Sequence, residues 1–195
     1  SQESIFREIH ELKKHPHWKG VVSDIGGATA ELYNTDCHNK KCPKTSCLSP
    51  NQCQSLRSTA PYLDLLRRAN QIQGVKKIFL GSGVRYDLLL QNPQLLEEIL
   101  RFHSGRFLRV APEHTESHVL KLMHKPPFER FGEFVKLFQK ITRDLKRKIE
   151  LAPYLIIGHP GEHRRDVQSM KKKLHSLGVR TTDVQIFTPS PGTLS

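Results

Sequence analysis

The four cysteines of this chain lie within one short stretch. They are Cys37, Cys42, Cys47 and Cys53, in the spacing C-x4-C-x4-C-x5-C, and no other cysteine occurs among the 195 residues. Four thiolates this close in sequence can supply a tetrahedral zinc site or an iron–sulfur cluster, because both prefer soft sulfur ligands. Disulfides and unmodified thiols are the alternatives, and the spacing does not choose among the three.

A second group of candidate residues follows the apolar stretches that read as strands. In parallel α/β folds, ligands bind at the carboxyl ends of the strands. Turns also favour Gly, Pro and Asp, so each residue taken singly has a purely structural interpretation. Charged residues recur at these ends, however, which favours one ligand-binding rim. The residues singled out are Asp24, Gly26, Gly27, Ser82, Gly83, Arg85, Glu113, His114, Gly158, His159, Pro160, Gly161 and Thr188.

Hydrophobic periodicity predicts the elements that must position these side chains. Strands and helices alternate along the chain, which predicts parallel strands and an α/β fold, either a doubly wound sheet or part of a (β/α) barrel. Residues 28–60 show no sustained period and form a long loop that contains the cysteines. The predicted strands are 21–26, 76–83, 107–111, 151–161 and 184–187, and the predicted helices are 4–14, 61–72, 93–100, 116–124, 128–147 and 163–177.

Motifs and composition argue against several classes of protein. The sequence after Gly81-Ser82-Gly83 lacks the third glycine of the dinucleotide fingerprint, and no GxxxxGK[ST] loop occurs, which disfavours NAD and ATP. No apolar stretch of about 18 residues is present, so we expect no membrane span and a cytoplasmic location. The net charge of +12 is compatible with a nucleic-acid partner, although the basic residues are spread over many elements.

Six separated segments resemble the YgiQ family of radical S-adenosylmethionine (SAM) proteins. They are SDIGGATAELY, C-x4-C-x4-SC-x-x-P-x-x-C, KKIFLGSGVRYDLL, LRVAPEHTESHVLKLMHKP, LAPYLIIGHPGE and VQIFTPSPGT, in this order. The resemblance covers essentially the whole chain, so residues 1–195 are expected to be a radical SAM core domain. It implies a partial TIM-type (β/α)6 barrel with parallel strands. It further implies an enzyme whose [4Fe–4S] cluster is reduced by an electron donor and then cleaves SAM to a 5′-deoxyadenosyl radical.

The resemblance also implies which residues contact SAM. Gly26 and Gly27 correspond to the glycine pair whose backbone meets the methionyl group, and Ala28 stands where the family usually has an acid. Glu113 corresponds to a polar contact from the fourth barrel strand. The residues expected to pack against adenine or to pass its edge are Ile156, Ile157, Gly158, Phe187 and Thr188.

One departure from the family pattern changes the expectation for this chain. The superfamily's cluster is held by a CxxxCxxC loop after the first barrel strand, and no such spacing occurs here. We therefore expect the first strand and the cluster ligands to lie upstream of Ser1, and the chain by itself to be inactive. The four cysteines could then hold a second metal centre. The alternative is a basic zinc-containing nucleic-acid-binding module. Neither interpretation identifies a catalytic residue or a substrate.

Overall fold

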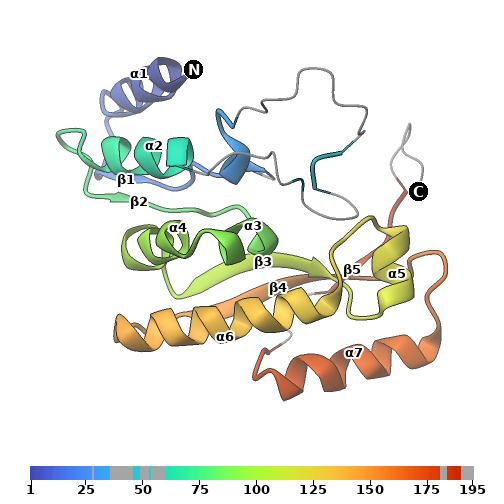
Figure 1. Ribbon diagram of the computed structural model, residues 1–195. Helices are drawn as coiled ribbons and strands as arrows, with labels where there is room; N and C mark the ends of the chain where they lie inside the picture. Colours follow the sequence, from blue (N-terminus) through green and yellow to red (C-terminus); the bar gives the residue numbers. More distant parts are fainter. Residues whose placement is uncertain (28, 36–45, 49–52, 54–59, 181–183, 190–195) are drawn as a thin grey trace.

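The computed structural model describes residues 1–27, 29–35, 46–48, 53, 60–180 and 184–189. The strands in these ranges are parallel and form two small sheets, shown in Figure 1. β1 (Val21–Val22) pairs with β2 (Lys77–Ile78). In the second sheet β4 (Glu150–Ile157) lies between β3 (Phe107–Glu113) and β5 (Val184–Ile186). The predicted α/β class with parallel strands is confirmed, and the described strands do not close into a barrel.

A single bridge connects the two sheets. Val84, which follows β2, pairs in parallel with Val110 of β3, and the N–H of Val84 donates to the carbonyl of Arg109 at 2.9 Å. Across the molecule the strands therefore follow one another in sequence order, from β1 to β5. The doubly wound alternative predicts a reversal of strand order, and none is present among the described strands.

The helices agree with the hydrophobic pattern except between β2 and β3. There the chain forms a short helix, α3, that the sequence did not predict, because six residues are too few to show a period. The helix predicted at 93–100 ends as the π-helical turn η2. The elements are α1 (Gln2–Leu12), the 3-10 helix η1 (Ala30–Leu32), α2 (Ala60–Asn70), α3 (Tyr86–Gln91), α4 (Pro93–Glu98), η2 (Ile99–His103), α5 (Ser117–Leu122), α6 (Phe128–Asp144) and α7 (Arg164–Ser176).

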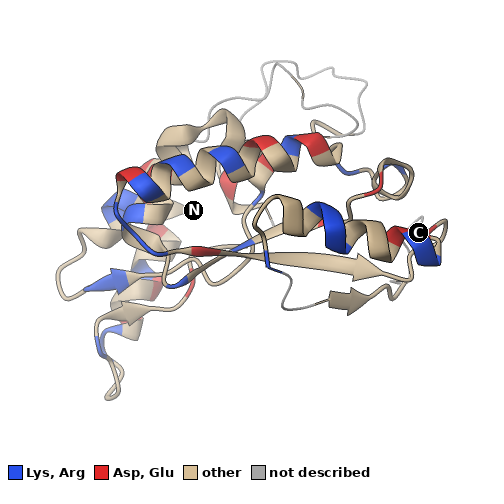
Figure 2. Cartoon of the chain, turned by 90° about the horizontal axis from the view of Figure 1, so that it is seen from below, with Lys and Arg blue, Asp and Glu red and all other residues tan. Residues whose placement is uncertain are grey.

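The main core lies on one face of the second sheet. Leu108 and Val110 of β3 are buried, whereas Phe107 and Arg109, which alternate with them, are exposed. The buried face packs against helices, with Leu96 of α4 among the residues that contribute to this core. Figure 2 shows Lys and Arg on several elements with Asp and Glu between them, so the positive charge is dispersed. No described helix has the length and apolar character that a membrane span requires.

Arg147, just after α6, fixes the end of η2 and hence the start of β3. Its guanidinium donates to the carbonyls of Leu100, Arg101 and Ser104, the last two at 2.9 and 3.1 Å. These carbonyls lie at the end of a helical segment, where backbone acceptors have no partner within the helix.

Replacing Arg147 with Met is expected to lower the free energy of unfolding by about 2 kcal/mol, because charged hydrogen bonds to three carbonyls are lost. Urea denaturation measures the change. The matched control is Arg143→Met, at an exposed position one turn earlier, where we expect a change within about 0.5 kcal/mol. Equal effects of the two substitutions would contradict this role of Arg147.

Candidate functional site

Asp24 joins the carboxyl ends of β1 and β2. Its Oδ1 accepts hydrogen bonds from the N–H groups of Gly26 and Gly81 at 2.7 and 3.0 Å. Its Oδ2 accepts from the N–H of Ser82 at 3.0 Å and from the Ser82 hydroxyl. One exposed carboxylate thus holds two loops that are distant in sequence, as the predicted rim requires.

The Asp24 carboxylate also shapes the turn that contains the glycine pair. A Cβ at Gly26 would lie 2.6 Å from Asp24 Oδ1, so this position needs a glycine. Among the described residues, a Cβ at Gly27 would meet no atom within 4 Å, so the backbone there is open to a ligand. Gly26 and Gly27 line a cavity of about 590 Å³ between α1, β1 and α2, beside Tyr62, whose hydroxyl donates to the carbonyl of Ile25.

Glu113 ends β3 in a strained turn. Its φ is 65°, and the N–H of His114 donates to the carbonyl of Pro112 at 2.8 Å, which closes a γ-turn around Glu113. The pairing of β3 with β4 is irregular between Val110 and Glu113. The Glu113 carboxylate pairs with Lys125 at 3.0 Å and lines a separate cavity of about 240 Å³.

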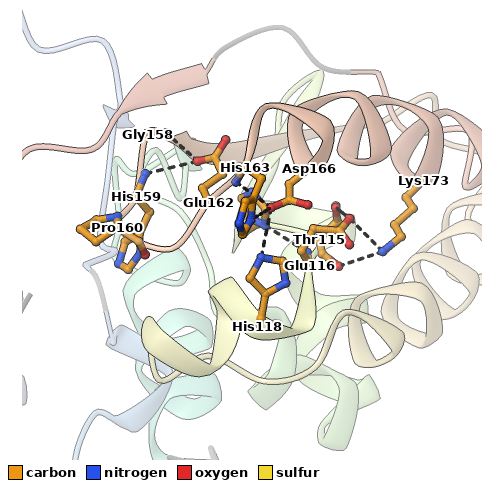
Figure 3. A network of polar contacts seen from close by, with 11 residues as sticks. Thr115, Glu116, His118, Gly158, His159, Pro160, Glu162, His163, Asp166 and Lys173 are labelled. Carbon is orange, nitrogen blue, oxygen red and sulfur yellow. Dashed lines mark hydrogen bonds and ion pairs between the residues drawn. The ribbon is translucent and has the colours of Figure 1, made fainter.

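The segment after β4 is a compact turn held by one carboxylate. Glu162 Oε2 accepts from the N–H groups of Gly158 and His159 at 2.6 and 3.2 Å (Figure 3). His159 is buried, and its Nδ1 lies 2.8 Å from the carbonyl of Pro160, so Nδ1 carries the proton. Its ring packs edge-on against Phe187 at 4.6 Å between centroids, which connects the ends of β4 and β5.

The structure brings together some of the predicted residues and separates others. Gly26 and Gly27 line one cavity, and Glu113 lines another with Gly83. Arg85, expected on the ligand rim, lines the same cavity as Glu113 and pairs with Asp87 at the start of α3, at 2.6 Å. The remaining predicted contacts are half-buried or exposed near the ends of β4 and β5: Ile156, Ile157, Gly158, Phe187 and Thr188.

The cysteine stretch is only partly described. Cys37 and Cys42 lie outside the described residues, as does Ala28. Cys47 and Cys53 are half-buried, and the N–H of Cys53 donates to the carbonyl of Cys47 at 2.7 Å, which closes the backbone between them. A metal centre formed by the four cysteines therefore stays a prediction.

Two groups near the rim are buried: Glu31, which sequence reasoning missed, and His114, which it singled out. Glu31 on η1 is 1% exposed; its Oε1 accepts from the N–H of Arg85 at 2.8 Å, and its Oε2 has no partner among the described residues. Burial raises the pKa of Glu31, although the Arg85 amide and guanidinium oppose the shift. His114 is fully buried, and burial lowers its pKa; its Nδ1 accepts from the N–H of Glu116.

A polar network that the sequence did not reveal extends outward from β3 and β4 (Figure 3). Asp166 Oδ2 lies 3.0 Å from His118 Nε2 and 3.3 Å from His163 Nδ1. Hydrogen bonds from the His163 backbone and from both imidazoles lower the pKa of Asp166. Nearby, Lys173 pairs with Glu116 at 2.9 Å. The available signal was a repeated spacing, H-x3-H, after each of the two strands.

Comparison with known proteins identifies relatives that extend well beyond this chain. The chain is 39% identical over 197 residues to a UPF0313 protein of Vibrio cholerae, covering 98% of the chain and 25% of that protein. It is also 39% identical to UPF0313 proteins of Methanocella arvoryzae, over 200 residues, and Porphyromonas gingivalis, over 210 residues. Each match covers the whole chain and 33% of the relative.

No family model matches the chain. The chain thus spans between a quarter and a third of the length of the curated relatives it matches. Similarity to UPF0313 proteins is established over essentially the whole chain. The names of these relatives state no activity, so the radical SAM assignment and the cytoplasmic location stay predictions.

Replacing Asp24 with Ala is expected to lower the free energy of unfolding by about 1–2 kcal/mol, because four hydrogen bonds to a charged but exposed acceptor are lost. Amide hydrogen exchange at Gly81 and Ser82 should accelerate. The control is Asp64→Ala, which removes an exposed helical ion pair with Arg68 and a long hydrogen bond from Gln2. Unchanged exchange at the two amides would show that Asp24 does not hold the loops together.

Glu31→Gln is expected to stabilise the protein increasingly as pH rises above 4.5, the ordinary pKa of the group. The folded state holds the proton more tightly than the unfolded chain, so the wild-type protein loses stability as pH rises through the raised pKa. Urea denaturation at about pH 4.5 and about pH 7.5 measures the difference between the two proteins.

Any change in the free energy of unfolding that the Gln amide causes equally at both pH values cancels in this comparison. The control substitution, Glu8→Gln at an exposed position of α1, should show no such trend. If the difference in free energy of unfolding between Glu31→Gln and the wild-type protein does not grow with pH, the inferred burial of a charge is contradicted.

Proposed function

We propose that this chain is part of a radical SAM iron–sulfur enzyme, and that the carboxyl ends of its parallel strands bind SAM. The [4Fe–4S] cluster would be held by cysteines that this chain does not contain. A cluster-bound SAM supplies a 5′-deoxyadenosyl radical when an electron donor reduces the cluster. The substrate is not identified by any residue described above.

The observation that carries the proposal is the order of the strands. Five parallel strands follow one another in sequence, joined by the bridge between Val84 and Val110. A (β/α) barrel has this order, and its ligands bind at the carboxyl ends of the strands. Since helices cover the face that contains Leu108 and Val110, the opposite face corresponds to the interior of the proposed partial barrel.

The residues at this edge fit SAM in their chemistry. Gly27 leaves its backbone open, and a Cβ at Gly158 would meet only the Ile186 side chain, at 3.9 Å. Ile156 offers a half-buried apolar surface for adenine, and the Phe187 backbone is fixed by its N–H bond to the carbonyl of Ile157. Glu113 adds a carboxylate positioned by Lys125.

These residues would bind and orient SAM in distinct ways. The Gly26–Gly27 backbone, held by Asp24, would contact the methionyl group. Ile156 and Gly158 would pack against adenine, and Phe187 and Thr188 would limit its outer edge. None of these residues provides a cluster ligand.

The alternative function is a basic zinc-containing nucleic-acid-binding module. No contact in the described part of the chain favours it over the first proposal, and the charge in Figure 2 is not gathered into one stripe. Salt-dependent binding of RNA together with stoichiometric zinc would be its signature.

The direct test uses the full-length protein, reconstituted anaerobically with iron and sulfide. With SAM and a reductant it is expected to form 5′-deoxyadenosine, detected by mass spectrometry. Failure to bind SAM, or absence of this product from protein that carries a full cluster, would overturn the proposal.

Gly27→Val separates ligand binding from folding. Because a side chain at Gly27 meets no protein atom nearby, the variant should keep the thermal stability of the parent and lose SAM affinity by about tenfold or more, equivalent to about 1.4 kcal/mol. The control is Gly105→Val, just before the amino end of β3 and so away from the carboxyl ends of the strands, which should leave SAM affinity unchanged. Parental SAM affinity in the Gly27 variant would rule out the predicted contact.

A further inference from the structure

We propose that His118, His163 and Asp166 form a binding site for a divalent transition-metal ion on the outer side of the edge formed by β3 and β4. The three residues come from two elements. His118 belongs to α5, which follows β3, whereas His163 and Asp166 begin α7, which follows β4. The site is independent of the cysteine stretch and of the proposed SAM contacts.

The distances suit a shared ion. His118 Nε2 and His163 Nδ1 lie 3.0 and 3.3 Å from Asp166 Oδ2, and all three atoms lie within 4.8 Å of one another. Ligands about 2.1 Å from a tetrahedral zinc ion are themselves about 3.4 Å apart. The His118 and His163 side chains are 48% and 60% exposed, so small rotations can bring their nitrogens to a common ion.

The chemistry of the three groups selects a class of metal. Two imidazoles and one carboxylate suit zinc and neighbouring late first-row ions rather than magnesium or calcium, which prefer oxygen ligands. Both imidazoles now place a ring nitrogen against the same carboxylate oxygen. An ion would take the place of these two contacts while each neutral imidazole keeps its proton on the other ring nitrogen. A fourth position would remain for water because both histidines face solvent.

Helix capping alone does not account for the whole arrangement. The capping interaction needs Asp166 and the backbone N–H of His163, which are 2.8 Å apart. His118 is not part of that cap, yet it reaches the same oxygen from a different helix, 48 residues away in sequence. A second imidazole, from α5, meets the carboxylate that caps α7. This convergence points to a ligand.

A bound ion would connect the segments that leave β3 and β4. Figure 3 shows the three residues beside Glu162, whose carboxylate holds the turn at Gly158 and His159. Fixing α5 to the first turn of α7 would therefore stiffen the turn that ends β4. We assign the ion a structural role on this edge of the sheet.

The test is titration of metal-free protein with Co²⁺, followed by visible absorption and isothermal titration calorimetry. We expect one equivalent bound through nitrogen and oxygen, without the thiolate-to-cobalt charge-transfer bands that cysteine ligands produce. Changing both His118 and His163 to Ala should remove this equivalent, and Zn²⁺ should compete for it in the parent protein.

The matched control is the double substitution His15→Ala and His17→Ala. These histidines are also exposed and have ring centroids 5.5 Å apart, against 5.8 Å for His118 and His163, but the pair has no carboxylate like Asp166 at its centre in the described structure. The control variant should bind Co²⁺ like the parent. Circular dichroism of the metal-free His118/His163 variant should be close to the parent, because Asp166 still accepts from the backbone N–H of residue 163, although the side-chain half of the capping box is lost.

Three results would overturn the proposal. They are the absence of a nitrogen- and oxygen-ligated equivalent in the parent, retention of that equivalent when His118 and His163 are both Ala, and its loss from the His15/His17 control. If the His118/His163 variant is misfolded, the single substitution His118→Gln replaces it. This variant keeps the helix and removes the imidazole ligand, so retained Co²⁺ binding there also rejects the site.

Discussion

The parallel pairing of β3 with β4 is the interaction on which the arrangement at the carboxyl ends of these two strands depends. Its register sets Val110 opposite Pro153 and Glu113 opposite Leu155, so β4 ends only two residues beyond the end of β3. The chains that leave them can then meet, which is how α5 and α7 bring His118 to Asp166. The irregularity that accompanies this register falls on Glu113, whose φ of 65° is sparsely populated for a residue with a Cβ. Such conformations cost about 1–3 kcal/mol and persist where the surroundings fix them. Here the ladder on one side and the Lys125 ion pair on the other do so.

The carboxyl ends of β1 and β2, in the other sheet, are held in a different way. β1 and β2 are each two residues long, so their ladder supplies few hydrogen bonds. Asp24 compensates for the short ladder by accepting from the loops that follow both strands. Side-chain bonds of this kind are typical of Asp in turns, where its carboxylate offers the backbone an alternative partner. The glycine pair and Gly158 are therefore each positioned by a carboxylate, of Asp24 and Glu162, whereas Glu113 is positioned by strand pairing.

The sequence was sufficient for the features that depend on local pattern. Apolar runs that end in Gly or charged residues located the strands, and the 3.6-residue period located the long helices such as α6. It was insufficient where the position of a residue depends on a particular side-chain partner, whether that partner is near or distant in sequence. Arg85 follows a strand, as a rim residue should, but Asp87 is two residues away and captures its guanidinium. The spacing of His114 and His118 would place both on one helical face, yet α5 begins only at Ser117. His114 is therefore held by the Glu116 backbone, and His118 is free to reach α7.

The two faces of the second sheet differ in how they are covered. On one face, Leu108 and Val110 are buried beneath helices. The other face has Arg109, whose guanidinium crosses to the carbonyl of Gly81 and so extends the connection that Asp24 makes between neighbouring strands. Polar bonds of this type keep an exposed sheet face in register without a hydrophobic layer. That arrangement suits a surface that closes around a ligand, because the strand ends are fixed before the ligand arrives. The backbone at Gly27, Glu113 and Gly158 is thus pre-formed. This agrees with the ordering of the strand ends by the side chains of Asp24, Arg109 and Glu162.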